Sequence, residues 1–208
     1  QMLKKIPKMD HGSWINTLNE KRRKIDTSIT EEGYINPHAF IRMLSDSLDE
    51  DAVCVADVGQ NQIWAATSYN VRKGRFLTSG GMGTMGYSVP CAIGAKTASP
   101  NTEVVAICGD GSFQMQMMEL ATACQHDIPI KIIVMSNNRL GMVREVQTRQ
   151  YGDRLCNIFL DGSPDFIKLA DSYGIKARRV DSIDNAQEAI DELISSKEPY
   201  LLECIVDP

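Results

Sequence analysis

Short apolar segments alternate with helical patterns along most of this 208-residue chain. Buried strands are indicated by AVCVADVG (52–59), EVVAICGDGS (103–112) and IKIIVMSNN (130–138), and each ends in a polar or glycine-rich turn. Two later strands are indicated by IKARRV (175–180) and PYLLECIV (199–206). This alternation predicts a three-layer α/β domain, in which helices cover both faces of a mostly parallel sheet. Open parallel sheets bind ligands at the carboxyl ends of their strands, where these turns lie.

Capping residues mark several of the predicted helices. Asn36 and Pro37 fit the N-cap and first position of a helix before the first strand. Ser112 is a candidate N-cap for the helix after the second strand, whose apolar face would hold Phe113, Met117, Leu120 and Cys124. Ser163 and Gly174 are the candidate N-cap and C′ residues of a later helix. Further helices are expected at about 60–69, 87–98 and 184–196.

The organisation along the chain suggests one domain with a polar leader. Residues 1–33 are charged and weakly periodic, and we expect a linker from a missing upstream domain, with one helix around 13–24. Residues 34–208 form the predicted domain. Both ends resemble cuts from something longer, so we expect the chain to be part of a larger protein.

Composition narrows the classes of function. The net charge is −5 and the one basic run, at 21–24, lies in the leader, which argues against nucleic-acid binding. There is no apolar run of membrane-spanning length and no signal-peptide pattern at the start. The six cysteines form no C-x-x-C pair and most lie in apolar segments, which favours a reducing compartment such as the cytoplasm over disulfides or zinc.

The segment from Gly109 to Asn138 carries the most specific chemical signal. Asp110 follows one strand and Asn137 ends the next, with a helix between them. If these strands are neighbours, the amide oxygen of Asn137 can face the carboxylate. The start of the helix at Ser112 favours a phosphate, and a cation such as Mg²⁺ would then have to separate that phosphate from Asp110.

Simpler interpretations of the same residues stay open. G-D-G and N-N are also ordinary turn sequences when taken separately. No G-x-x-x-x-G-K-[ST] pattern occurs, and GGMGTMG fits a dinucleotide fingerprint poorly, yet a generic nucleotide-binding domain remains an alternative. The methionines can fill gaps in the core, and Gln60 can be a solvent-facing residue at the start of a helix.

The motif GDGS (109–112) followed by NN (137–138) resembles the signature of enzymes that use thiamine diphosphate on 2-keto acids. DVGQNQIWAA (57–66), LTSGGMGTMGYSVPCAIGAK (77–96), NNRLGMV (137–143) and SPDFIKLADSYG (163–174) extend the likeness to the catalytic subunit of the acetohydroxyacid (acetolactate) synthase family. The resemblance covers about 34–207. It corresponds to the C-terminal, diphosphate-binding domain of that subunit.

The resemblance implies a role for each matching residue. The Mg²⁺ ligands would be Asp110, Asn137 and the main-chain carbonyl of Arg139. Met85 is similar to the residue that bends the cofactor, and Met142 to an apolar wall of the site. The diphosphate would be contacted by Gly109, Gly111, Ser112, Gln60 and Asn61, and the aminopyrimidine by the carbonyl of Gly83. The family often has histidine in place of Asn61, whose amide we expect to donate a hydrogen bond instead.

The resemblance also implies parts that lie elsewhere. The family's activating glutamate belongs to a pyrimidine-binding domain, supplied in cis or by a second subunit, so no catalytic residue is assigned here and the isolated chain is expected to be inactive. A homo-oligomer is expected, pyruvate would be the first substrate, and FAD would bind only the full-length enzyme. Val146 stands near the position where many relatives have a tryptophan, which leaves the acceptor open. Other 2-keto acid decarboxylases or carboligases, and a non-catalytic cofactor-binding subunit, remain alternatives.

Overall fold

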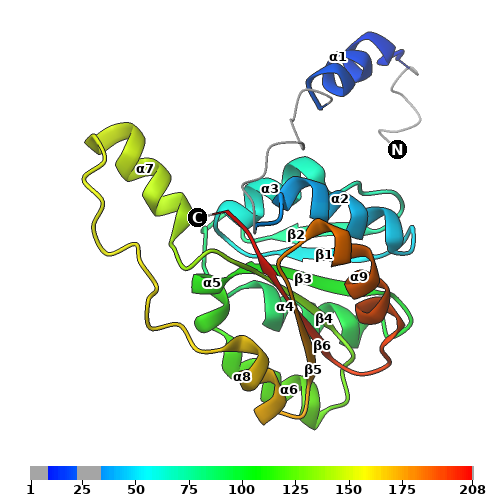
Figure 1. The fold of residues 1–208 in the computed structure, drawn as a ribbon. Coiled ribbons are helices and arrows are strands. Elements are labelled where there is room, and N and C mark those ends of the chain that lie inside the picture. Colours follow the sequence, from blue (N-terminus) through cyan, green and yellow to red (C-terminus); the bar gives the residue numbers. More distant parts are fainter. Residues whose placement is uncertain (1–8, 23–33, 208) are drawn as a thin grey trace.

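Six parallel strands form one sheet in the computed structural model, which describes residues 9–22 and 34–207 (Figure 1). The spatial order of the strands is β2-β1-β3-β4-β6-β5, which places β1, β3, β4 and β6 inside the sheet. All the strand pairs of this sheet are parallel, as the strand–helix alternation predicts. The bounds are β1 Val53–Ala56, β2 Arg75–Thr78, β3 Val104–Gly109, β4 Lys131–Ser136, β5 Lys176–Val180 and β6 Tyr200–Ile205.

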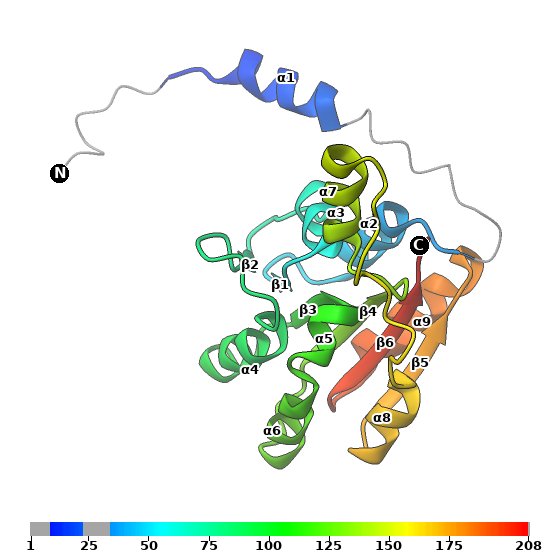
Figure 2. The ribbon, with the colours of Figure 1, turned by 90° about the vertical axis from the view of Figure 1, so that its left-hand side faces the viewer.

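Two apolar layers hold the helices against the sheet. Helices α2, α3 and α9 pack on one face, and α4, α5, α6 and α8 pack on the other (Figure 2). The three-layer α/β arrangement expected from the sequence is therefore confirmed. The bounds are α1 Gly12–Arg22, α2 Pro37–Ser47, α3 Gln60–Ser68, α4 Ser88–Ala98, α5 Asp110–Gln114, α6 Leu120–Gln125, α7 Gly141–Tyr151, α8 Phe166–Ser172 and α9 Ala186–Ser195, with short 3₁₀ turns η2 Met117–Glu119 and η3 Ile183–Asn185.

The central strands are apolar on both sides because each face is covered. In β3, Val105 and Ile107 belong to the layer under α2, α3 and α9, whereas Ala106 and Cys108 belong to the opposite layer. All of these side chains are fully buried. A strand covered on both faces needs no polar alternation, which is why the sequence shows continuous apolar runs.

Two of the predicted helix boundaries are confirmed. The side chain of Asn36 accepts hydrogen bonds from the main-chain amides of His38 and Ala39, and Pro37 opens α2. At the end of α8, Gly174 has a φ of 73°, the left-handed conformation expected of a C′ residue.

Two predicted N-caps are wrong. Helix α5 begins at Asp110, so Ser112 lies inside its first turn, where its hydroxyl hydrogen-bonds the main chain of Gly109. The expected single helix is also interrupted at Gln116, which separates α5 from η2 and α6. Helix α8 is capped by Asp165 rather than by Ser163, whose hydroxyl instead donates to the carbonyl of Leu160.

Two elements were missing from the sequence prediction. Strand β2 lies at the edge of the sheet and is only partly buried, so its four residues form no continuous apolar run such as the one that marks β1. Helix α7 has no buried residue, so it lacks the apolar stripe by which helices are recognised. Figure 1 shows α7 extending from the carboxyl edge of the sheet.

The leader is described only in part. Helix α1, Gly12–Arg22, overlaps the helix predicted around 13–24, whose last two residues lie outside the described residues. Residues 1–8 and 23–33 lie outside the described residues, so the linker assigned to 1–33 stays a prediction. Among the helices that the structure describes, none combines the length and apolar character needed to cross a membrane.

Candidate functional site

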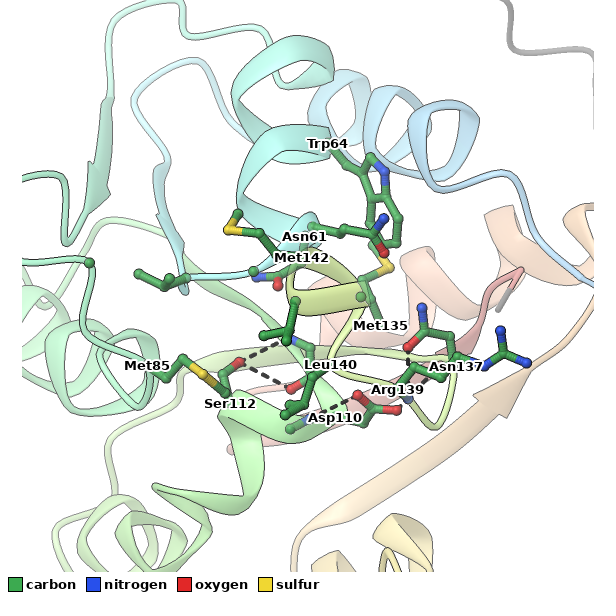
Figure 3. Close-up of a pocket in the computed structure, with 18 of the residues that line it drawn as sticks. Asn61, Trp64, Met85, Asp110, Ser112, Met135, Asn137, Arg139, Leu140 and Met142 are labelled. Carbon is green, nitrogen blue, oxygen red and sulfur yellow. Dashed lines mark hydrogen bonds between the residues drawn. The ribbon is translucent and has the colours of Figure 1, made fainter. Parts of the chain in front are cut away.

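A cavity of about 370 Å³ opens at the carboxyl edge of the sheet (Figure 3). The turns after β1, β3 and β4 contribute to its wall, together with the glycine-rich loop after β2 and the start of α7. Every site residue predicted from the sequence lines this cavity: Gln60, Asn61, Gly83, Met85, Gly109, Asp110, Gly111, Ser112, Asn137, Arg139 and Met142.

Asp110 joins the ends of β3 and β4. One carboxylate oxygen accepts a hydrogen bond from the main-chain amide of Gly111 at 2.8 Å. The other accepts from the main-chain amide of Asn137 at 3.0 Å and from that of Asn138. The two strands are neighbours, which is the condition under which Asp110 and Asn137 were expected to meet. The contact runs through the amide N–H of Asn137, however, and not through its side-chain oxygen.

The carboxylate of Asp110 is buried without a cationic side chain beside it. Only 1% of the residue is exposed, and no salt bridge reaches it from the described residues. Burial raises the pKa of Asp110, and the surrounding main-chain amides oppose that rise. When ionised, a buried carboxylate held only by neutral donors retains its full charge, which a bound cation would neutralise.

Asn137 and Arg139 complete an oxygen-rich turn beside Asp110. The side-chain oxygen of Asn137 accepts from the main-chain amide of Arg139 at 3.2 Å. The guanidinium of Arg139 lies over the ring of Phe159, 5.5 Å from its centroid. No group of three or more His, Cys, Asp or Glu side chains within the described ranges could hold a metal. A metal here would therefore need one carboxylate supplemented by amide and carbonyl oxygens, a donor set that suits Mg²⁺.

Two helices begin at the cavity without side-chain caps. Neither Gly59, before α3, nor Leu140, before α7, places a side chain on the first-turn amides. Helix starts away from the cavity differ among themselves: Asn36 and Asp165 cap α2 and α8, whereas α6 and α9 begin without a side-chain cap. First-turn amides without a side-chain partner, together with the helix dipoles, favour an anion in the cavity.

The side-chain amide of Asn61 is hydrogen-bonded to the protein's own main chain. The side chain is buried, and its nitrogen donates to the carbonyls of Asp57 at 2.9 Å and Ile107 at 3.3 Å. Both of its hydrogens are therefore used to join the ends of β1 and β3, which leaves the oxygen as its free polar atom. Donation from Asn61 to a diphosphate stays a prediction, and it would require the amide nitrogen to give up one of these two carbonyls.

Gln60 closes the other side of the cavity by packing on the start of α7. A methyl group on Gly141 would lie 1.9 Å from the side-chain oxygen of Gln60, so no larger residue fits there without displacing it. The atoms in the way belong to a flexible side chain, so the contact shows that Gln60 packs closely on Gly141 without making glycine obligatory. Gly141 was not singled out in the sequence, because this contact joins segments far apart in the chain.

Apolar side chains cover the remaining wall. Leu140 and Met85 approach Gly111 from the cavity side: a methyl group on Gly111 would lie 2.6 Å from Leu140 and 3.7 Å from Met85. Trp64, Met135 and Leu140 line the cavity but were missed as site residues, since apolar residues in helices and strands usually belong to the core. Val146 also lines the cavity and is 41% exposed.

A family model described as "Thiamine pyrophosphate enzyme, C-terminal TPP binding domain" matches residues 57–204, most of the chain. The chain belongs to this family. The cofactor in the family's description carries a diphosphate, which is the kind of anion that the first-turn amides of α3 and α7 favour. The glycine-rich turn and the asparagine turn that carried the resemblance both lie inside the matched segment.

Named relatives of this thiamine-pyrophosphate-binding domain are acetolactate synthase large subunits. A probable acetolactate synthase large subunit of Methanococcus aeolicus is 42% identical over 95% of this chain and 34% of its own length. The acetolactate synthase large subunit of Lactococcus lactis subsp. lactis is 39% identical over 95% and 34%. The isozyme 2 large subunit of Escherichia coli is 42% identical over 81% and 31%. The chain thus spans about a third of the length of the curated relatives it matches.

Proposed function

We propose that this chain is the diphosphate- and magnesium-binding domain of an acetolactate synthase catalytic subunit. The observation that carries the proposal is the cavity itself, where α3 and α7 begin without caps beside a buried carboxylate that no described cationic side chain pairs. Such a site suits an anion and a divalent cation bound together. The proposed activity is that named for the similar proteins, which are acetolactate synthase large subunits.

The metal would be held at the ends of β3 and β4. Asp110 would supply a carboxylate oxygen, Asn137 its amide oxygen and Arg139 its main-chain carbonyl. The side-chain oxygen of Asn137 already accepts a hydrogen bond from the main-chain amide of Arg139 at 3.2 Å, and its second lone pair would be available to the ion. The carboxylate of Asp110 is already in place, so the ion would replace a costly buried charge with a neutralised one.

The cofactor would lie between the two open helix starts and the glycine-rich loop. Gly109, Gly111, Ser112 and Gln60 would contact the diphosphate. The carbonyl of Gly83 would accept from the aminopyrimidine, Met85 would hold the bent form, and Met142 would form an apolar wall. Thiamine diphosphate supplies the chemistry by which a 2-keto acid loses carbon dioxide and is joined to an acceptor.

The protein's own residues contribute orientation and exclusion of water. Leu140 and Met85 already pack against Gly111, so a ligand in the cavity would be covered by apolar side chains. Holding a bound group in one geometry removes entropy from the reaction barrier, and an apolar cover strengthens the electrostatic contacts inside. The activating glutamate would come from a pyrimidine-binding domain, in cis or on a second subunit of a homo-oligomer.

The substrates of the whole enzyme would be pyruvate and a second 2-keto acid, in a cytoplasmic pathway to branched-chain amino acids. FAD would bind only outside this domain. A second candidate, another 2-keto acid decarboxylase or carboligase, is favoured by Val146: this small residue borders the cavity where many relatives have tryptophan, and it leaves room for other acceptors.

Calorimetry and product analysis on the native protein test these proposals. Thiamine diphosphate with Mg²⁺ is expected to bind more tightly than ATP or NAD, and removal of Mg²⁺ by a chelator is expected to abolish that binding. Tighter binding of ATP would contradict the assignment. With pyruvate alone, acetolactate is the expected product, whereas acetaldehyde would favour the decarboxylase.

A further inference from the structure

We propose that Asp57 and Gln116 form a buried pair that positions the glycine-rich loop 79–86, and through it Met85, over the cofactor cavity. Asp57 does not line the cavity, and only one step of hydrogen bonding separates it from the loop. The inference rests on the proposed cofactor function of the cavity. It adds a positioning role to two residues that contact neither cofactor nor metal.

The carboxylate of Asp57 is fully buried and joins three separate segments. One oxygen accepts from the main-chain amides of Val58 at 2.9 Å and Gly86 at 3.0 Å. The other accepts from the main-chain amide of Ser88 at 2.7 Å and from the side-chain nitrogen of Gln116 at 2.9 Å. Both oxygens therefore have two donors, and the end of β1, the loop and the start of α4 meet at one charge.

Gln116 completes the arrangement from the other side. Its side-chain oxygen accepts from the amide of Val89 at 2.8 Å, and its nitrogen also donates to the hydroxyl of Ser88 at 3.1 Å. Together, Asp57 and Gln116 serve as the N-cap that Tyr87 does not provide to α4. The interruption between α5 and η2 falls at Gln116, at the point where its side chain reaches this cluster.

The loop has little else to fix it. Its other hydrogen bonds are local, from Gly83 and Thr84 back to Ser79 and from Gly80 to Thr78. Methyl groups on Gly80, Gly81 or Gly83 would meet nothing within 4 Å. Within the described part of the chain, the hydrogen bond from Gly86 to Asp57 is the one that joins residues 79–86 to a distant segment.

The conformation of Gly86 links its hydrogen bond with Asp57 to the orientation of Met85. Its φ is 85°, and a methyl group there would lie 3.2 Å from the side chain of Met115. The chain therefore leaves the loop in a conformation that favours glycine, held by Asp57 on one side and Met115 on the other. Because Met85 is the preceding residue, the same contacts set where its side chain enters the cavity.

The test exchanges the carboxylate and the amide of the pair between positions 57 and 116 in the native protein. Asp57→Asn places an amide nitrogen opposite donors, and Gln116→Glu places a carboxylate opposite Asp57. In the double variant, the new amide at position 57 can donate to the new carboxylate at position 116, and the net charge and most hydrogen bonds are restored. Binding is measured with two probes: thiamine diphosphate with Mg²⁺, and inorganic diphosphate with Mg²⁺, which lacks the part that Met85 would contact.

The expected result is selective. Each single variant should weaken thiamine diphosphate binding by about tenfold and leave inorganic diphosphate within about twofold, and the double variant should recover most of the loss. Met85→Ala should show the same selectivity, and adding Asp57→Asn to it should cost little more. Asp165→Asn, which removes part of the α8 cap, is the matched control and should not change the ratio of the two affinities.

Other outcomes separate the two hypotheses. If the wild-type protein binds neither probe, the proposed cofactor function fails. If the wild type binds both and the single variants weaken both equally, or neither, the positioning role is overturned. If a single variant does not fold, the double variant decides: folding with wild-type selectivity supports the pair, and failure to fold or lost selectivity refutes it.

Discussion

Asp57 and Asp110 stand at corresponding places in the sheet and have different partners. Each follows a central strand, β1 or β3, and these strands are hydrogen-bonded neighbours. Both residues are buried, with 0% and 1% exposed. Asp57 has two donors on each oxygen, one of them a side chain. Asp110 accepts only from main-chain amides and lines the cavity.

The difference shows how one sequence signal serves two purposes. A carboxylate at the end of a parallel strand becomes structural when other segments bring enough donors to saturate both oxygens. It becomes available to a ligand when it borders a cavity and accepts hydrogen bonds only from neutral main-chain amides, those of its own turn and of the turn after the neighbouring strand. The predictions below compare the two aspartates directly.

The largest expected effect is on cofactor binding at Asp110. Asp110→Ala should lower the affinity for thiamine diphosphate with Mg²⁺ by at least about 100-fold, because it removes the proposed charged metal ligand itself and not a supporting residue. Asp57→Asn should cost about tenfold in the same titration. Calorimetry on the native protein measures both, and an unchanged affinity in Asp110→Ala would refute the metal site.

The next effect is on stability and belongs to Asp57. Asp57→Asn loses about two of four hydrogen bonds to a buried carboxylate, which should lower the free energy of unfolding by about 3 kcal/mol. Urea denaturation of the metal-free protein checks this value. The exchanged pair Asp57→Asn with Gln116→Glu should regain more than half of it. A loss of the same size in the double variant would mean that the pair does not act as a unit.

Asp110→Asn should affect stability in the opposite direction: in metal-free protein it should not lower the free energy of unfolding. Burial raises the pKa of Asp110 above its ordinary value of 3.8, so folding favours the protonated form. The stability from this preference is fully present below the unfolded-state pKa and is lost as pH rises through the folded-state pKa. At neutral pH the Asn variant should therefore match or exceed wild type, by up to about 1 kcal/mol after the loss of one hydrogen bond.

The control for this prediction is pH itself. The stability difference between Asp110→Asn and wild type should shrink as the solution is acidified through the folded-state pKa, because protonated Asp resembles Asn. Urea titrations at several pH values measure it. A variant that is clearly less stable than wild type at neutral pH would show that the charge of Asp110 is compensated inside the protein.

The smallest effect on stability concerns the residue after each aspartate. Val58 follows Asp57, whereas Gly111 follows Asp110 and lies under Leu140. Gly111→Ala should change the free energy of unfolding by less than about 1 kcal/mol, since the gain in helix propensity offsets the displacement of the Leu140 side chain. Thermal unfolding measures this change. Gly94→Ala in α4, where the added methyl group meets nothing within 4 Å, is the matched control, because it gains helix propensity without displacing a side chain.

Cofactor titration gives this last substitution a second measurement. The added methyl group would displace the Leu140 side chain, which lines the cavity proposed for the cofactor, so affinity should fall in Gly111→Ala and stay unchanged in Gly94→Ala, which lies outside the cavity lining. Equal affinities in the two variants would show that no ligand approaches Leu140 closely.

Much of the site followed from the chain's linear pattern. Asp110 and Asn137 follow consecutive strands with a helix between them, and consecutive strands are often neighbours in a parallel sheet. The sequence therefore allowed both residues to meet at one edge, and the pairing of β3 with β4 brings them together, whereas β2 and β3 are consecutive without being neighbours. The roles of Asp110 and Asn137, taken from the family resemblance, stay predictions until binding is measured.

Contacts between distant segments could not be read from the sequence. Asn61 fits a diphosphate donor by its place in the resemblance, yet its hydrogens are used by the carbonyls of Asp57 and Ile107. Trp64 and Leu140 look like core residues but border the cavity. Helix α7 has no buried face, so no periodicity could reveal it.

The sequence by itself determined the α/β class, the parallel direction of the strands and the edge at which ligands would bind, because these depend on local apolar runs and on short connections. Only the tertiary structure decided which of the two buried aspartates is saturated and which is open. That choice depends on where Gln116, Gly86 and Ser88 come to lie around Asp57. Hydrogen-bond saturation depends on segments far apart in the chain, and no local pattern encodes it.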